Sequence, residues 1–410
     1  MDQAVLSIST LMSSTPASTP SAAPSPSAGT AAVALPRRPL GGTGLSVSIL
    51  GFGGSPLGGV FEDVPEDVAI ASVHEAFRLG INYFDTSPYY AATKVGRGLG
   101  AFLGPEQLFS STSITSLHLS CPIIAHARPP PSAPLRPQRN AFQSETVLGK
   151  ALATLPRADI VVASKVGRYG PNPEDFDFSA ERVERSVRES LSRLQVDYID
   201  VVACHDVEFG DLEQVRTGAL PALARLKAEG VVRHVGVTGL PLGCLRQVLS
   251  EAPAGSVDTV LSYCRWCLCD RALEGELDGW AAAGLGIVNA SPLSMGLLTP
   301  GGPPSWHPAP EPLQRACRAA AARCAQLGVS LPKLALKWAL TADARVATTL
   351  VGMCRPDQVR ENVATAIEAF RGVEGGEEAE EATALAEVEA LLAPVLGTTW
   401  PSGRPENDIK

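Results

Sequence analysis

The stretch DIVVASKVGRYGPNPEDFDFSAERVERSVRESLSRLQVDYIDVVACH, residues 159–205, holds a helical segment between two apolar runs. The flanking runs, 159–165 and 197–205, are short and rich in Val, Ile and Ala, which is typical of buried strands. The apolar stripe between them, at helical spacing, consists of Val183, Val187, Leu191 and Leu194. Strands joined through a helix usually run parallel, so this stretch predicts a βαβ unit.

The same alternation extends along most of the chain. Eight strand-like runs occur, at 47–53, 81–87, 159–165, 197–205, 232–239, 259–264, 286–292 and 347–353. Segments of helical period lie between most of them. Eight β/α units predict parallel strands that close into a (β/α)8 TIM barrel. The glycine-rich segment 38–48 before the first run predicts a hairpin that turns on Gly41, Gly42 and Gly44.

Composition narrows the classes of partner. The chain has 410 residues and a net charge of −9, which gives no general attraction for nucleic acid or anionic membranes. No apolar run reaches the roughly 18 residues that span a bilayer. These features favour a small-molecule partner and leave the oligomeric state open.

The cysteines indicate a reducing compartment. Nine cysteines form an odd number spread over a long chain, which is typical of reduced thiols and predicts a cytoplasmic protein. The alternative is the plastid, because residues 1–35 weakly resemble a transit peptide. Cys264 and Cys267 have the spacing of a metal-binding pair, but no second pair follows at a matching distance. We therefore expect Cys264, Cys267 and Cys269 to be core residues and expect no metal.

Three segments depart from the regular pattern. Residues 1–35 are rich in Ser, Thr, Ala and Pro and carry a single acidic residue, which predicts a disordered tail. Residues 95–143 contain the proline-rich run ARPPPSAPLRPQR and interrupt the barrel pattern, which otherwise covers 36–403. Residues 404–410 are expected to form a short C-terminal tail.

Four side chains at strand ends suggest proton-transfer chemistry. Asp85, Lys165 and His205 end three successive predicted strands, and Tyr90 follows the first of them. Catalytic groups of a barrel gather at the C-terminal ends of its strands. A tyrosine with a pKa of about 10 is a poor proton shuttle, and a nearby ammonium lowers that pKa. Lys165 can supply this charge, Asp85 can hold the lysine, and His205 can bind the reacting oxygen.

A competing interpretation uses a local motif. Tyr90 and Lys94 form Y-x-x-x-K, the acid and lysine pair of short-chain dehydrogenases with a doubly wound sheet. That fold needs a G-x-G-x-x-G loop after its first strand, and GFGGSPLGG at 51–59 does not fit this spacing. The barrel is therefore favoured.

The strand ends resemble those of a known family. INYFDTSPYY, VVASK and DYIDVVACH are similar to the segments that carry the Asp, Tyr, Lys and His tetrad of the aldo-keto reductase superfamily. The family's tyrosine follows its aspartate by five residues, which selects Tyr90 over Tyr89. The resemblance implies that Asp85, Tyr90, Lys165 and His205 are catalytic.

Other strings resemble one branch of this family, the plant-type L-galactose dehydrogenases. They are GFGGSPLGGVF, CHDVEFG, ASPLSMGLLT and the terminal WPSG. This resemblance implies NAD-dependent oxidation of L-galactose at C1 to the 1,4-lactone in ascorbate biosynthesis, with Tyr90 as general base. The alternatives are another aldose, such as L-fucose or D-arabinose, and a non-catalytic, cofactor-binding regulatory barrel.

The resemblance also implies a cofactor site. Matching the family's motifs places Thr238 at the nicotinamide amide, Ser291 and Leu293 beside the pyrophosphate, and Glu361 and Asn362 on the adenine. Gly239 stands where the family has an asparagine, and Ala290 where it has the tyrosine that stacks on nicotinamide. We expect Trp266 to replace this aromatic ring. Gly352 and Gln358 stand where phosphate-selective members carry Lys and Arg, which favours NAD over NADP.

The interruption also departs from the family. Lys165 follows Asp85 by 80 positions, and removal of the 49 residues 95–143 would reduce this to 31, a spacing typical of the family. Two interpretations stay open: a retained intron that is translated, or a disordered lid over the barrel mouth.

Overall fold

The computed structural model describes residues 34–59, 64–90, 143–371 and 377–409. All but Gln143 of the predicted insertion 95–143, and all but the last two residues of the predicted tail 1–35, lie outside these ranges. Leu35, at the end of the predicted tail, is already buried in the core.

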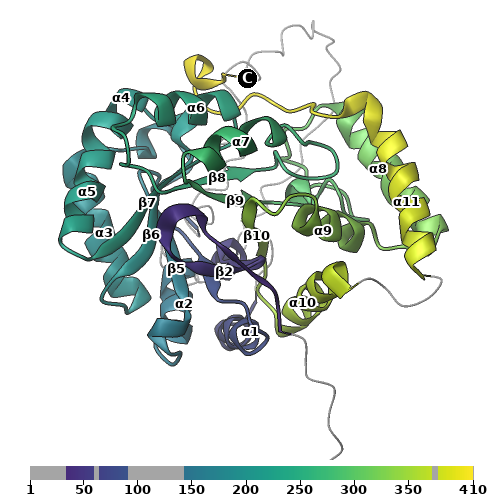
Figure 1. Ribbon diagram of the computed structural model, residues 1–410, viewed down its shortest axis with the longest axis horizontal. Helices are drawn as coiled ribbons and strands as arrows, with labels where there is room; N and C mark the ends of the chain where they lie inside the picture. Colours follow the sequence, from purple (N-terminus) through teal and green to yellow (C-terminus); the bar gives the residue numbers. More distant parts are fainter. Residues whose placement is uncertain (1–33, 60–63, 91–142, 372–376, 410) are drawn as a thin grey trace, which may run out of the picture. The chain divides into compact units, whose positions relative to one another are not determined.

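A closed barrel of eight parallel strands forms the centre of the described chain (Figure 1). The strands are β3 (Leu50–Gly53), β4 (Tyr83–Asp85), β5 (Val161–Val166), β6 (Ile199–Cys204), β7 (Val232–Gly239), β8 (Thr259–Tyr263), β9 (Gly286–Ala290) and β10 (Val346–Gly352). They pair in chain order, and β10 closes the ring on β3. The predicted (β/α)8 barrel is therefore confirmed.

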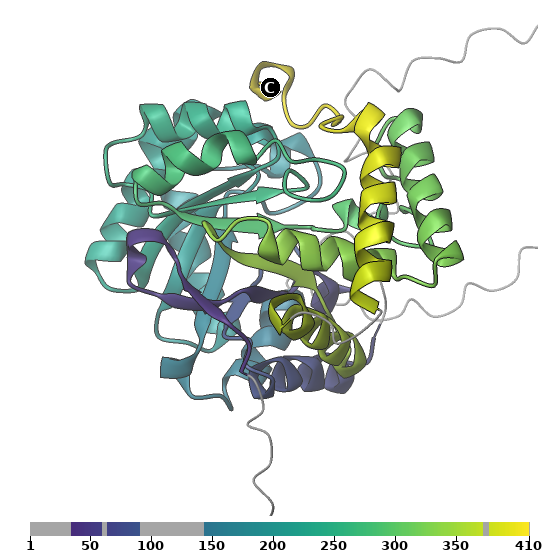
Figure 2. The same cartoon turned by 45° about the vertical axis from the view of Figure 1, so that its right-hand side comes forward.

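Helices surround the strands (Figures 1 and 2). They are α1 (Glu66–Arg78), α2 (Gln143–Leu152), α3 (Ala180–Leu194), α4 (Leu212–Gln214), α5 (Leu220–Ala228), α6 (Leu242–Glu251), α7 (Glu274–Ala282), α8 (Glu311–Gln326), α9 (Leu331–Thr341), α10 (Pro356–Arg371) and α11 (Glu377–Leu392). On α3, the predicted stripe members Val183, Val187 and Leu194 are buried. Helices α8 and α11 pack side by side outside the ring.

Two apolar layers hold the barrel together. The inner layer fills the space within the strands and includes Tyr83, Val201, Val288 and Leu350. The outer layer lies between the strands and the helices. This double burial explains the near-continuous apolar runs of the sequence, because strands of a parallel sheet are covered on both faces.

The predicted hairpin is present and closes one end of the barrel. Strand β1 (Arg37–Pro39) pairs antiparallel with β2 (Ser46–Ser48), and Gly42 N donates to Gly284 O just before β9. The prediction of one strand at 47–53 is wrong in one respect. The first two residues of this run belong to β2, and only Leu50–Gly53 join the barrel. The two strands are separated at Ile49, whose N donates to Pro36 O.

The C-terminal residues return to the barrel. Residues 404–409, predicted as a tail, pack against the loop after β6: Arg404 N donates to Glu208 O, and Asn407 is buried. No helix in the described part of the chain is long and apolar enough to cross a membrane.

Candidate active site

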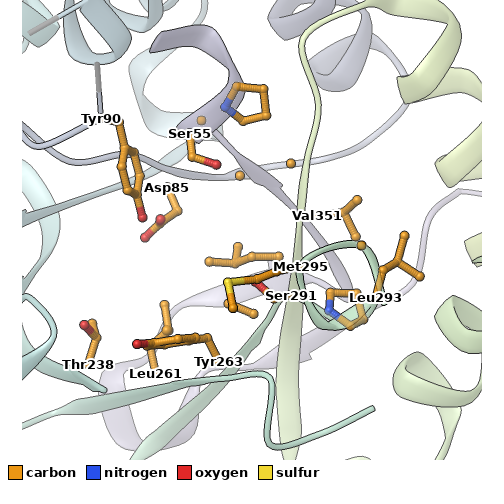
Figure 3. A pocket seen from close by; sticks show the side chains of 18 of the residues that line it. Ser55, Asp85, Tyr90, Thr238, Leu261, Tyr263, Ser291, Leu293, Met295 and Val351 are labelled. Atoms are coloured by element: carbon orange, nitrogen blue, oxygen red, sulfur yellow. The ribbon is translucent and has the colours of Figure 1, made fainter. Parts of the chain in front are cut away.

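The four predicted catalytic residues converge at the C-terminal end of the barrel. Asp85 ends β4, Lys165 lies in β5, His205 follows β6, and Tyr90 lies in the turn after β4. Lys165 Nζ lies 2.5 Å from Asp85 Oδ1 and 5.0 Å from the centre of the Tyr90 ring. The rings of Tyr90 and His205 meet edge to face at 5.6 Å between centroids. Figure 3 shows Asp85 and Tyr90 side by side on one wall of a cavity.

Lys165 is a buried, permanently charged ammonium. Burial alone would lower its pKa, but the Asp85 carboxylate and Tyr90 more than offset this, and the pKa is raised. Nζ also donates to Thr86 O at 2.9 Å, which fixes its direction. The pair supplies a positive charge held next to the Tyr90 ring.

Two opposing effects set the pKa of Tyr90. Lys165 lowers this pKa as expected, but burial of the phenol is the larger effect and raises the pKa to about 12. Asp85 and Asp206 add to the rise. The lowering of this pKa by Lys165 is therefore present as expected, but desolvation of the phenolate outweighs it. Without Lys165 the pKa of Tyr90 would be higher still, and less phenolate would form.

His205 is neutral and lies beside the Ser87 hydroxyl. Burial is the main cause that lowers its pKa, to about 3. Ser87 Oγ accepts a hydrogen bond from Tyr89 N at 3.1 Å and lies 3.0 Å from His205 Nδ1. These contacts are compatible with the tautomer in which the Ser87 hydroxyl donates to Nδ1 and the imidazole proton is on Nε2. His205 can then donate from Nε2 to an oxygen in the cavity.

A second buried ion pair, absent from the sequence prediction, lines the same cavity. Arg168 Nη1 donates to Asp206 Oδ2, and both side chains are buried. The Arg168 guanidinium lies 3.9 Å from the centre of the Tyr89 ring. Tyr89 thus packs on Arg168 while Tyr90 packs on Lys165, so the two adjacent tyrosines have different neighbours. The ion pair could have been suspected from the sequence, because Asp206 directly follows the predicted site residue His205.

The cavity has a volume of about 700 Å³, and a smaller cavity has a volume of about 190 Å³. Both are lined by Pro292, Leu293 and Val351. The tetrad, Thr238 and Ser291 line the larger cavity, and Glu361 and Asn362, on α10, line the smaller one. The predicted catalytic and cofactor-binding residues therefore line two cavities that have wall residues in common.

This site fits an extended dinucleotide. Thr238 and Ser291 supply hydroxyls, and Ser291 has a left-handed φ of 57° where the chain leaves β9. Apolar walls separate this polar end from the carboxylate and amide of Glu361 and Asn362. Few polar groups on apolar walls are typical of cofactor pockets.

Trp266 does not take the expected stacking position. The indole is 3% exposed, packs on Trp338 at 5.0 Å between ring centres and donates from Nε1 to Ala339 O. It belongs to the outer apolar layer and is absent from the cavity lining. The aromatic ring that lines the cavity from this region is Tyr263, at the end of β8, which sequence reasoning missed (Figure 3).

The cysteine cluster is buried core. Cys267 Sγ lies 3.5 Å from Cys269 Sγ, and both residues lie in a compact apolar group with Cys264. Burial contributes to raising the pKa of the Cys264 and Cys267 thiols. Within the described ranges, no group of three or more His, Cys, Asp or Glu residues is arranged to hold a metal.

Similar proteins include several dehydrogenases and reductases. The chain is 45% identical over 372 residues to an L-galactose dehydrogenase of Arabidopsis thaliana, covering 90% of this chain and 98% of that protein. It is 29% identical to a D-threo-aldose 1-dehydrogenase of a Pseudomonas species, covering 78% and 89%. A D-arabinose 1-dehydrogenase of Saccharomyces cerevisiae is also 29% identical, with coverage of 77% and 82%.

Solved structures agree with the fold. An aldo-keto reductase from Bacillus halodurans, in its holo form, superposes with a TM-score of 0.61 at 23% identity, covering 91% of this chain and 99% of that one. The sequence profile of the Aldo/keto reductase family matches residues 49–116 and 140–371. The barrel, the tetrad and the profile lead to one conclusion: this chain is a member of the aldo/keto reductase family, oxidoreductases that use nicotinamide cofactors.

Proposed function

We propose that this protein oxidises L-galactose at C1 to L-galactono-1,4-lactone with NAD⁺, and that Tyr90 is the general base. One observation carries the proposal: Tyr90, Lys165 and His205 converge on one cavity in a chain 45% identical to an L-galactose dehydrogenase. Two further relatives are named as aldose 1-dehydrogenases, which supports C1 of an aldose as the reacting carbon. The proposed setting is ascorbate biosynthesis in the cytoplasm.

The tetrad divides the work of the reaction. The nicotinamide cofactor, when bound, supplies the acceptor for the hydride that leaves C1. His205 donates from Nε2 to the C1 oxygen and orients it. Tyr90 takes the hydroxyl proton, and the Lys165 ammonium stabilises the phenolate that must exist beforehand. Asp85 holds Lys165 in place through the 2.5 Å ion pair.

The choice of NAD over NADP rests on the groups near α10. Gln358 Oε1 accepts from Cys354 N at 3.0 Å and from Arg355 N at 3.3 Å, so this side chain is engaged and uncharged. Arg355 pairs with Asp357, and Arg360 pairs with Glu75. A 2′-phosphate near Gln358 would meet cations already bound to carboxylates, which weakens charge-assisted binding. Lys333 on α9 lines the smaller cavity and is the cation to test.

The test is initial-rate measurement with a panel of sugars and both cofactors. We expect the highest kcat/KM with L-galactose and NAD⁺, lower values with L-fucose and D-arabinose, and slow reaction with NADP⁺. A faster reaction with D-arabinose would contradict the substrate. NAD⁺ binding without oxidation of any sugar would favour the non-catalytic regulatory barrel. If NADP⁺ is preferred, Lys333→Ala identifies whether that lysine is the reason.

A further inference from the structure

Glu208 is a buried carboxyl behind the cavity wall. It lies in the turn Val207–Phe209 after β6 and is 0% exposed. Its Oε1 accepts hydrogen bonds from Leu240 N at 3.1 Å, Tyr263 Oη at 3.0 Å and Ser402 Oγ at 3.2 Å. Its Oε2 has no partner among the described residues. One oxygen thus joins a cavity-lining tyrosine to a residue near the C-terminus.

The backbone of Glu208 binds the same terminal segment. Its carbonyl oxygen accepts from Arg404 N and from Asn407 Nδ2, both at 2.9 Å. Gly403 has φ of +85°, and a Cβ there would lie 2.3 Å from Glu208 O. We call Ser402–Asn407 the C-terminal strap. It touches Glu208 through side chain and main chain, so the carboxyl lies at its anchoring point.

Gly239, the last residue of β7, leaves space for the Glu208 carboxyl because it has no side chain. A Cβ at Gly239 would lie 2.8 Å from Glu208 Oε2. A longer side chain at 239 would therefore require the Glu208 carboxyl to shift from this position. The carboxyl is held in one place between β7, β8 and the strap.

The surroundings of this carboxyl favour its neutral form. Burial, and then the nearby Asp206 carboxylate, raise the pKa of Glu208 to about 8. Tyr263 donates to it, and the Cys244 thiol on α6 is the other titratable group that faces it. A protonated carboxyl with one accepting oxygen suits a buried structural link better than a charge without a cation.

We propose that Glu208 is a positioning residue for the sugar: its carboxyl fixes the Tyr263 hydroxyl, and with it one wall of the cavity, to the C-terminal strap. Figure 3 places Tyr263 across the cavity from Tyr90, where a sugar on the tetrad would meet it. The inference rests on the proposed function, because it takes the aldose as the ligand that needs this wall. Glu208 does not line the cavity, so it acts through Tyr263.

The test compares Glu208→Ala with a matched control in the full chain. Asp200 is a buried carboxyl near the opposite end of β6, where it accepts from Arg157 at 2.6 Å and from Val162 N at 2.9 Å. We expect Glu208→Ala to raise KM for L-galactose about tenfold, with kcat and the Kd of NAD⁺ changed by less than about threefold. Asp200→Ala should lower the unfolding temperature and leave KM within about twofold.

Two further variants separate positioning from folding. Glu208→Gln keeps the accepting oxygen and should recover at least half of the lost affinity. Tyr263→Phe should raise KM, and adding Glu208→Ala should raise it little more, because residues that act through one link are not additive. If Glu208→Ala fails to fold, Ser402→Ala is measured in its place, because this variant removes only one hydrogen-bond donor to Glu208.

The outcomes distinguish this inference from the proposed function. An unchanged KM in an active Glu208→Ala enzyme, or an equal rise in Asp200→Ala, overturns the inference while the function stands. If the wild-type chain oxidises no sugar, the proposed function fails, and hydrogen exchange tests the link alone. Faster exchange at Ser402–Asn407 in Glu208→Ala than in Asp200→Ala then supports the link, and equal exchange overturns it.

Discussion

The backbone nitrogen of Ser144 lies 3.4 Å from the carbonyl oxygen of Tyr90 and donates to it, although the two residues are far apart in sequence. Ser144 Oγ also donates to Gly54 O at 2.7 Å and lies 2.8 Å from Thr86 Oγ1. The catalytic turn and the start of α2 are therefore fastened together at the two ends of the interruption. We propose that the barrel does not need 95–143, which favours a translated intron over a lid.

Joining Lys94 directly to Ser144 should give a folded and active enzyme. The four residues 91–94 suffice to close a turn between groups already within hydrogen-bonding distance. We expect kcat/KM for L-galactose within about threefold of the full chain and an equal or higher unfolding temperature, since a shorter loop costs less closure entropy. Sequencing transcripts across this junction tests the intron directly. Loss of the cooperative unfolding transition would contradict the prediction.

Tyr90→Phe should abolish turnover and spare cofactor binding. A positioned acid or base contributes about 10²–10⁴-fold in rate, and the Tyr90 ring lies 5.0 Å from Lys165 Nζ. Steady-state rates and NAD⁺ titration by tryptophan fluorescence measure the two effects. The matched control is Tyr89→Phe, because the Tyr89 hydroxyl has no hydrogen-bond partner among the described residues. A larger loss in Tyr89→Phe would exchange the roles of the two tyrosines.

Oxidation should accelerate with pH, and Lys165→Met should move this profile to higher pH. The base is the phenolate of Tyr90, whose pKa burial raises to about 12 while Lys165 lowers it. Removing the ammonium leaves burial unopposed, so the pKa rises further and less phenolate exists at pH 8. We expect at least a tenfold lower kcat/KM there, and the same ratio at pH 10, because both pH values lie below the Tyr90 pKa of either enzyme. An unchanged profile in Lys165→Met would remove this role from the lysine.

Glu208→Gln should change how stability depends on pH. The folded-state pKa of Glu208 is raised from the ordinary value of 4.5 to about 8. Between these values the folded chain keeps a proton that the unfolded chain has lost, so the free energy of unfolding falls as pH rises. The slope is on the order of 1 kcal/mol per pH unit. Glutamine cannot titrate. The free energy of unfolding of the variant should therefore rise relative to that of the wild type as the pH increases from 5 to 8.

Urea unfolding at pH 5, 6, 7 and 8 measures this difference. We expect the two midpoints to be closest at pH 5 and to separate steadily up to pH 8. Asp200→Asn is a suitable reference, because it removes another buried carboxyl on β6. A difference between Glu208→Gln and wild type that stays constant with pH would show that Glu208 is already ionised at pH 5.

Local patterns were enough to predict the barrel and the convergence of Asp85, Tyr90, Lys165 and His205 on one cavity. Each strand is an apolar run covered on both faces, and each predicted catalytic residue lies at or just beyond a strand end, where the side chains of a barrel converge. A residue at the C-terminal end of a predicted strand can therefore be placed at the same end of the barrel as the other site residues. Gly239 also gains an explanation: it departs from the family's asparagine, and a Cβ there would meet Glu208 Oε2.

Partners that depend on distant segments could not be predicted. Glu208 meets Ser402 across 194 positions, and no local pattern records that contact. Trp266 was misplaced because its distance in sequence from β8 does not say which face it takes, and packing on Trp338 turned it outward. The sign of the Tyr90 pKa shift likewise depends on burial, which a list of neighbouring charges does not contain.

The pairing of β10 with β3 has a consequence for synthesis of the chain. Leu50 finds its partner Thr349 only when most of the protein has left the ribosome. Until then, the growing sheet exposes the free edge of β3, with backbone groups ready to pair with another chain. All four tetrad residues are synthesised early, but the enclosed ring that holds them forms last. We therefore expect truncated translation products to aggregate rather than to retain partial activity.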